Sequence, residues 1–193
     1  MSDFTDEELF RRSAKGDEHA FTALYRRRHP SVFRFALHMS GRTEVAEEVT
    51  QDVFLTLIRE PGRFDETRGA LSAFLFGVAR NCVLRHIERD RRHVLMEEDS
   101  DFDPEAEGPD VLAELTREQA IDAVRQAVLS LPSTYREVVV LCDLEEMSYS
   151  GAADVLGVPV GTVRSRLNRG RGLLLDKLRA KEPGVRSAVR CSA

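Results

Sequence analysis

The feature that most constrains the fold is an acidic segment in the middle of the chain. Residues 97–110, EEDSDFDPEAEGPD, hold eight carboxylates and two prolines and no basic side chain. Such a stretch repels itself and buries too little apolar surface to offset the entropy lost on ordering. It therefore divides the 193 residues into two parts, each large enough for only a small hydrophobic core.

The part before the acidic segment is rich in signals for the beginnings and ends of helices. Thr5 and Glu8 form a T-x-x-E capping box, which predicts a helix that begins directly after Thr5. Pro30 follows a helical pattern and is predicted to separate two helices, because proline lacks the amide donor that a helix interior needs. Gly41 is predicted to end the second of these, and Thr43 to cap the next.

Two further amphipathic helices complete the first part. In the segment after Thr43, apolar residues recur at helical spacing and predict a core stripe formed by Ala46, Val49, Val53 and Leu57. A helix that begins near Leu71 follows the loop RFDETRG. Cys82 and His86 lie one turn apart on its apolar face, where they are better explained as core residues than as half of a metal site.

The part after the acidic segment predicts a helix-turn-helix. Ser148 caps a short helix, YSGAADVL, Gly157 turns the chain, and a basic helix begins near residue 161. We find no strand-like alternation of useful length. The fold class is therefore all-α, with two small helical domains joined by an acidic flexible linker, and the second domain contains the helix-turn-helix.

The last helix has one apolar and one basic face. An advance of about 100° per residue places Val163, Leu167, Gly170, Leu174 and Leu178 on the core face. The opposite band carries arginine, asparagine and serine, residue types that read base edges in the DNA major groove and hold phosphates. The alternative is a solvated basic face on an ordinary bundle helix.

Two glycines in this helix, Gly170 and Gly172, are expected to weaken it. Each costs a helix interior about 1 kcal/mol relative to alanine. We therefore expect the segment around 168–174 to become fully ordered only on DNA.

Several classes of function receive no support from the sequence. The three cysteines are far apart and form no C-x-x-C, which disfavours a disulfide framework or a structural zinc site. No run of about 18 apolar residues predicts a membrane span, and the acidic amino terminus is unlike a signal peptide. No motif of a hydrolase, kinase or nucleotide-binding loop is present. We expect a cytoplasmic protein that is not an enzyme and that needs neither cofactor nor metal.

These motifs together resemble the extracytoplasmic-function sigma factors of the sigma-70 family. Residues 131–178 are similar to sigma region 4, and GTVRSRL is the most specific string within them. In the first part, AEEVTQDVFLTL resembles region 2.2, and the run from FDETRG to ERDRR resembles regions 2.3 and 2.4. The resemblance implies a bacterial initiation factor that binds the clamp coiled coil and flap of the core RNA polymerase, promoter DNA and an anti-sigma factor.

The resemblance also implies roles for individual residues. The polymerase-binding surface would comprise Glu48, Gln51, Asp52 and Phe54. Recognition and melting of the minus-ten element would fall to Phe64, Asp65, Glu66, Thr67, Arg80 and Asn81. Recognition of the minus-thirty-five element would have two parts. The bases would be contacted by Arg164, Asn168 and Arg169. The DNA backbone would be contacted by Thr162, Ser165, Arg166 and Arg171.

The implied domain bounds are 1–95 for the region 2-like domain, 96–111 for the linker, 112–182 for the region 4-like domain and 183–193 for a mobile tail. An alternative function remains open at this point. A transcription regulator could bind duplex DNA through the same helix-turn-helix without acting in initiation. The sequence does not identify the promoter, the inducing signal or the role of the tail, nor does it say whether Thr50 or Thr56 is phosphorylated.

Overall fold

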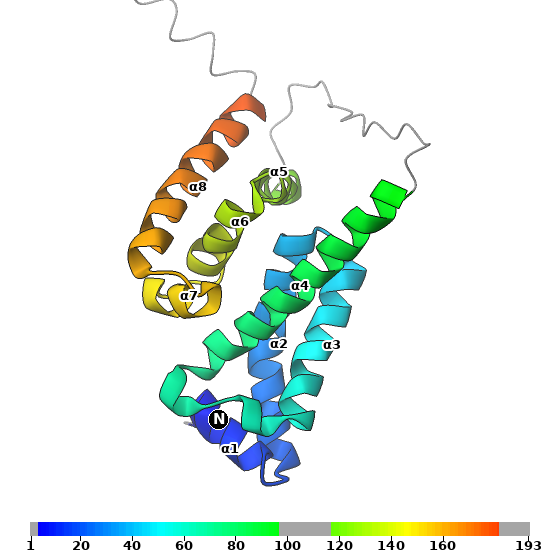
Figure 1. The fold of residues 1–193 in the computed structure, drawn as a ribbon, viewed down its shortest axis with the longest axis vertical. Coiled ribbons are helices and arrows are strands. Elements are labelled where there is room, and N and C mark those ends of the chain that lie inside the picture. Colours follow the sequence, from blue (N-terminus) through cyan, green and yellow to red (C-terminus); the bar gives the residue numbers. More distant parts are fainter. Residues whose placement is uncertain (1–3, 97–116, 182–193) are drawn as a thin grey trace, which may run out of the picture.

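The computed structural model describes residues 4–96 and 117–181, and these residues form helices and connecting loops without a strand (Figure 1). The all-α prediction is confirmed. The acidic segment 97–110 and the tail 183–193 lie outside the described residues. The elements of the first unit are α1 (Asp6–Ser13), α2 (Glu18–Ser40), α3 (Thr43–Arg59), the 3₁₀ turns η1 (Pro61–Arg63) and η2 (Glu66–Arg68), and α4 (Leu71–Met96). Those of the second unit are α5 (Arg117–Leu129), α6 (Ser133–Val139), the π-helical turn η3 (Val140–Leu144), α7 (Tyr149–Leu156) and α8 (Val160–Lys181).

In the first unit, α2, α3 and α4 pack against one another and α1 lies across their end. The predicted capping box is present, since Thr5 Oγ1 accepts the Glu8 amide and the Glu8 carboxylate accepts the Thr5 amide. Gly41 ends α2 in the left-handed conformation at φ +76°, as predicted. Thr43 is the first residue of α3 rather than its cap, because Arg42 occupies the cap position and makes no side-chain cap bond.

The prediction that Pro30 separates two helices is wrong. α2 runs without interruption from Glu18 to Ser40 with Pro30 inside it. Leu24, Val32 and Phe35 on either side of the proline are all at most 1% exposed. They lie on one face, so a single continuous helix buries them together, and this burial outweighs the roughly 3 kcal/mol that an interior proline costs.

In the second unit, α8 packs along α6, and α7 crosses the end of α8 to form the predicted helix-turn-helix. Ser148 Oγ accepts the Gly151 amide and caps α7, and Gly157 turns the chain at φ +64°. α8 begins at Val160, one residue before the predicted start. Val163, Leu167 and Gly170 are buried as predicted, whereas Leu174 and Leu178 are half-buried.

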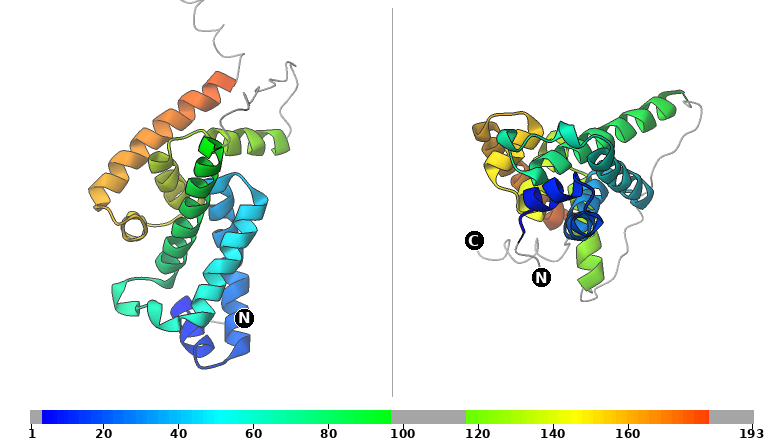
Figure 2. Two further views of the ribbon diagram at one scale, coloured as in Figure 1. Left: turned by 45° about the vertical axis from the view of Figure 1, so that its right-hand side comes forward. Right: turned by 90° about the horizontal axis from the view of Figure 1, so that it is seen from below.

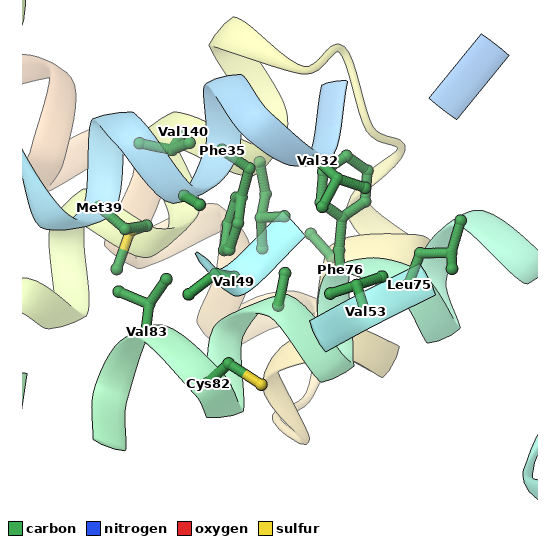
Figure 3. Close-up of a cluster of buried hydrophobic side chains, with 14 of the residues drawn as sticks. Val32, Phe35, Met39, Val49, Val53, Leu75, Phe76, Cys82, Val83 and Val140 are labelled. Atoms are coloured by element: carbon green, nitrogen blue, oxygen red, sulfur yellow. The ribbon is translucent and has the colours of Figure 1, made fainter. Parts of the chain in front are cut away.

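The two units lie side by side in every view and share one hydrophobic core (Figure 2). Val140 of η3 belongs to the cluster that contains Phe35 and Met39 of α2 (Figure 3). α4 packs against α7, and α2 contacts α5 and α6. At the end of α2, a Cβ placed on Gly41 would come within 3.0 Å of Leu129. The two helical units therefore form a closed arrangement.

Candidate nucleic-acid and polymerase interface

The face of α8 opposite its buried stripe is open. Arg164, Ser165, Asn168 and Arg169 are exposed, while Thr162 and Arg166 are half-buried. The Arg164 guanidinium lies 5.8 Å from the centre of the Tyr149 ring, which steadies it at the side of α7. The exposed residues thus present hydrogen-bond donors on one face of α8, an arrangement that fits into a major groove.

Arg171 differs from its neighbours because it already has a partner. Its guanidinium Nε lies 3.0 Å from Asp143 of η3, and this carboxylate raises the pKa of Arg171. A DNA phosphate would have to compete with Asp143 for this side chain. Arg171 was predicted to hold the DNA backbone, but in this arrangement it ties α8 to η3.

Gly170 has a structural purpose that the sequence did not reveal. A Cβ at this position would lie 2.8 Å from Val139 Cγ2 and 3.4 Å from the Tyr135 carbonyl oxygen. Its missing side chain lets α8 approach α6 closely, whereas a Cβ on Gly172 would meet nothing within 4 Å. The helix cost predicted for Gly170 is therefore accompanied by a packing role, which Gly172 does not share.

The predicted minus-ten loop, residues 64–67, is held by aromatic contacts on one side and exposed on the other. The Phe64 ring lies 5.3 Å from Phe10 and 5.6 Å from Phe74, measured between ring centroids. Asp65 accepts hydrogen bonds from the Thr67 hydroxyl and amide, which lower the pKa of its carboxyl group. Asp65, Glu66 and Thr67 are exposed. The loop therefore exposes polar groups next to a cluster of aromatic rings.

Arg80 and Asn81 are neighbours on α4 but have different surroundings. Asn81 is exposed, whereas Arg80 lies against the second unit and its Nε donates to Glu137 Oε1 at 2.9 Å. The Glu137 side chain is 6% exposed and the Arg80 side chain 24%. Of the predicted strand-binding residues, Arg80 is thus engaged by the other unit. A sign of this was available, because Glu137 stands one turn before Leu141 on the buried side of its helix.

Two further polar contacts cross between the units. Glu145, whose side chain is 2% exposed, pairs with Arg34 of α2 at 2.9 Å. Burial raises the pKa of the Glu145 carboxyl group, and the Arg34 guanidinium opposes that rise. Arg136 donates to the Met39 carbonyl oxygen of α2 at 2.7 Å and also to the Leu131 carbonyl oxygen at 3.0 Å. The sequence does not predict these contacts between the units, because each residue lies far along the chain from its partner.

The predicted polymerase-binding face of α3 has the expected acidic surface with one revision. Glu48 and Gln51 are exposed and Asp52 is half-exposed. Phe54, however, is 3% exposed, and its ring centroid lies 4.7 Å from that of Tyr25. Because it stands three residues before Leu57, it falls on the buried side of α3 and supports the surface without belonging to it.

The threonines of α3 are bonded within the helix. Thr50 is 2% exposed, and its hydroxyl donates to the Ala46 carbonyl oxygen at 2.6 Å. The Thr56 hydroxyl donates to the Asp52 carbonyl oxygen at 2.8 Å. Thr50 is therefore closed to a modifying enzyme in this arrangement.

A groove between α3 and α4 brings opposite charges together. Glu48 and Asp52 line one wall, and the other wall is basic, formed by Arg85, Arg89 and Arg92. Cys82 and His86 lie at its base and are 4% and 8% exposed, as expected of core residues. Within the ranges 4–96 and 117–181, no group of three or more metal-ligating side chains gathers. No helix in those ranges is long and apolar enough to cross a membrane.

Comparison with known families shows the class to which this arrangement belongs. The family model described as sigma-70 region 2 matches residues 24–93, and the one described as sigma-70, region 4 matches residues 121–174. These spans cover α3 and α7 and most of α4 and α8. The acidic face of α3, the loop 64–67 and the exposed basic face of α8 thus fall within two regions of the sigma-70 family.

Individual relatives narrow the class. The chain is 37% identical to the ECF RNA polymerase sigma factor SigE of Mycolicibacterium smegmatis, over 86% of this chain and 65% of that protein. It is 32% identical to the ECF RNA polymerase sigma factor SigM of Mycobacterium tuberculosis, over 94% of this chain and 88% of that protein. The chain belongs to the extracytoplasmic-function RNA polymerase sigma factors.

Solved structures show the same fold. CnrH, in complex with the cytosolic domain of CnrY, matches with a TM-score of 0.69 at 27% identity, over 92% of this chain and 99% of that chain. The sigma factor RpoE of Bartonella quintana, in complex with the anti-sigma factor NepR, matches with a TM-score of 0.67 at 24% identity, over 84% and 98% of the two chains.

Proposed function

We propose that this chain directs the core bacterial RNA polymerase to a specific set of promoters and opens them. The main support is that a chain of this family presents two separate surfaces suited to nucleic acid, the basic face of α8 and the exposed loop 64–67. A duplex reader needs only the first surface. The second surface is the loop 64–67, whose polar groups lie over a cluster of aromatic rings, and it suits an unpaired nucleotide. The chain itself would act without catalysis.

The proposed roles of individual residues are those that the family resemblance implies, and the exposure of most of these side chains supports them. Arg164, Asn168 and Arg169 read bases of the minus-thirty-five duplex. Thr162, Ser165 and Arg166 hold the phosphates, and Arg171 joins them when it leaves Asp143. Glu48, Gln51 and Asp52 dock on the clamp coiled coil, with Phe54 fixing the helix beneath them. Joining two modest DNA readers in one complex raises the affinity through effective concentration.

The minus-ten element is recognised by the loop residues together with Asn81 and Arg80. The loop and Asn81 are available in the closed arrangement, whereas Arg80 must leave Glu137 before it can hold a strand. The closed arrangement is then an inactive form of the free protein, and docking on the polymerase separates the units. The domain bounds 1–95, 96–111, 112–182 and 183–193 describe the parts that would move.

Control by a protein partner is part of the proposal. CnrH and RpoE, which share this fold, were solved with the cytosolic domain of CnrY and with the anti-sigma factor NepR. We propose that an anti-sigma factor holds this chain in an inactive form, and that the chain acts in the cytoplasm, where the polymerase is found. The flap of the polymerase is the partner proposed for the second unit.

The proposal is tested by transcription in vitro with purified core polymerase, with and without this protein, on a genomic promoter library read out by transcript start sites. Discrete new starts with two shared upstream motifs at fixed spacing would support it. If the protein alone bound specific duplex sites and produced no starts with active core, it would be a regulator of the helix-turn-helix class instead.

A further inference from the structure

α1 lies before both spans that match the sigma-70 family, which begin at residues 24 and 121. It nevertheless contacts the minus-ten loop and the helix that follows it. No role was assigned to α1 from the sequence. Its contacts fall into two groups, one that fixes the helix to the bundle and one that reaches the loop.

The anchoring group holds α1 to α2. Asp6 is 6% exposed, and its carboxylate accepts a hydrogen bond from Arg27 at 2.9 Å and pairs with Arg28. Leu9 and Phe10 of the same helix are buried in the core, at 2% and 6% exposure. Because two arginines and the core fix it, α1 can hold in place the residues that reach the loop.

The second group reaches the loop at three points. The Phe10 ring meets Phe64 edge-on, at 5.3 Å between centroids and an interplanar angle of 85°. Arg11 Nε lies 3.0 Å from Glu66 Oε1, with both side chains largely exposed. Glu7 Oε1 accepts the Leu71 amide at 3.0 Å, at the point where the loop ends and α4 begins.

The Glu7 bond replaces a local helix cap. Gly69 and Ala70, which precede α4, have no side chain that could accept an amide of its first turn. A carboxylate at this end of a helix is also favoured by the helix dipole. The α4 cap therefore comes from residue 7, so the direction in which the chain leaves the loop depends on α1.

We infer that α1 positions the minus-ten loop for capture of an unpaired base, with Glu7 as its principal positioning residue and Arg11 as a weaker one. This inference rests on the proposed function of the loop. Between Glu60 and Leu71 the chain forms only two 3₁₀ turns, so few bonds of its own fix the loop. Holding both ends reduces the entropy that the loop would lose on binding a strand.

The test compares Glu7→Ala and Glu7→Gln in the full chain bound to core polymerase. Glu18→Ala is the matched control, because Glu18 is an exposed acidic residue in the first turn of α2. The probe is a single strand that carries the minus-ten segment of a promoter used by the wild-type holoenzyme. We expect Glu7→Ala to weaken strand binding about tenfold, as loss of a helix cap predicts, and Glu7→Gln, which keeps an acceptor, about threefold or less.

A role confined to positioning requires that the affinity of the variants for core polymerase and for the minus-thirty-five duplex stay within about twofold of wild type. Equal strand affinity for Glu7→Ala and wild type, or a parallel loss of core binding, would overturn the inference. Arg11→Ala removes an exposed pair without a folding cost, and it should weaken strand binding about twofold even if Glu7→Ala folds poorly. No effect of Arg11→Ala in that case would also count against the inference. A wild-type holoenzyme that bound no strand would instead refute the proposed function.

Discussion

The two surfaces proposed to bind DNA are built in different ways. The one on α8 is the exposed side of a single helix whose buried side packs on α6. The one in the first unit combines a loop, the middle of α4 and contacts from α1, and one of its members, Arg80, is bound by the second unit. A duplex groove accepts a preformed helix, whereas an unpaired base needs a pocket assembled from several elements. The difference explains why the base-reading residues of α8 are open in the closed arrangement, whereas Arg80 of the other surface is held by Glu137.

The largest effect is expected on the α8 surface. Arg169→Ala and Asn168→Ala should each weaken binding to the minus-thirty-five duplex by about 1–3 kcal/mol, the range for loss of a bidentate base contact. Arg179→Ala is the control, because Arg179 is exposed on the same helix but lies about 15 Å further along its axis. Binding is measured on wild-type and base-substituted duplexes at one salt concentration. Equal losses for Arg179→Ala and Arg169→Ala would show that α8 offers only general charge.

The next effect concerns the support of α8 and uses its two glycines. Gly170→Ala should destabilise the protein by about 1–3 kcal/mol, because the added methyl group overlaps Val139 in a packed seam. Gly172→Ala meets open space and should stabilise α8 by up to about 1 kcal/mol. Denaturant unfolding of both variants measures the two free energies. Stabilisation by both substitutions would contradict the close packing of α8 on α6.

A smaller effect is expected where the two helical units meet. Glu137→Gln keeps the shape of the side chain but removes the charge that binds Arg80, so the closed arrangement should loosen by about 1 kcal/mol. Asp122→Asn is the control, because it removes the charge of an exposed pair on α5. The population of separated units follows from distances between spin labels on α3 and α8. An unchanged distance distribution for Glu137→Gln would mean that the pair does not hold the units together.

The smallest effect is a dependence of the closed arrangement on pH. Burial lowers the pKa of His38 on α2, and the guanidinium groups of Arg125 on α5 and Arg34 add to that effect. Because Arg125 belongs to the other unit, its charge lowers the pKa of His38 only when the units are together, so the closed arrangement binds fewer protons at His38 than the separated units. Its stability should therefore fall as the pH drops below about 6.5, the ordinary pKa of histidine, towards the lowered value. The same distance measurement at a series of pH values checks this, and His38→Gln should flatten the response.

Much of the fold was predictable because helix signals are local. The capping box at Thr5, the end of α2 at Gly41 and the turn at Gly157 each depend on a few neighbouring residues, and each prediction is confirmed. The break predicted at Pro30 was wrong because core burial on both sides of the proline decides the matter, and burial depends on distant helices.

The candidate site was predictable to a similar extent. The open side of α8 and the acidic side of α3 follow from helical periodicity alone. The engagement of Arg80 by Glu137, the close approach at Gly170 and the cap that Glu7 gives to α4 all join residues distant along the chain. Periodicity contains no information about such pairs. The burial of Phe54 could have been deduced from its spacing to Leu57, and the resemblance to a known family obscured it.

The buried carboxylates between the two units have a consequence for temperature. Separation returns the carboxylates of Glu137 and Glu145 to water. Hydration of charged groups becomes more favourable as the temperature falls, and the apolar contacts around Val140 weaken in the same direction. Both contributions have the same sign, so cold favours the separated form and warmth the closed one. If the separated form is the one that binds polymerase, as proposed, the amount of protein ready to bind it should rise as the temperature falls.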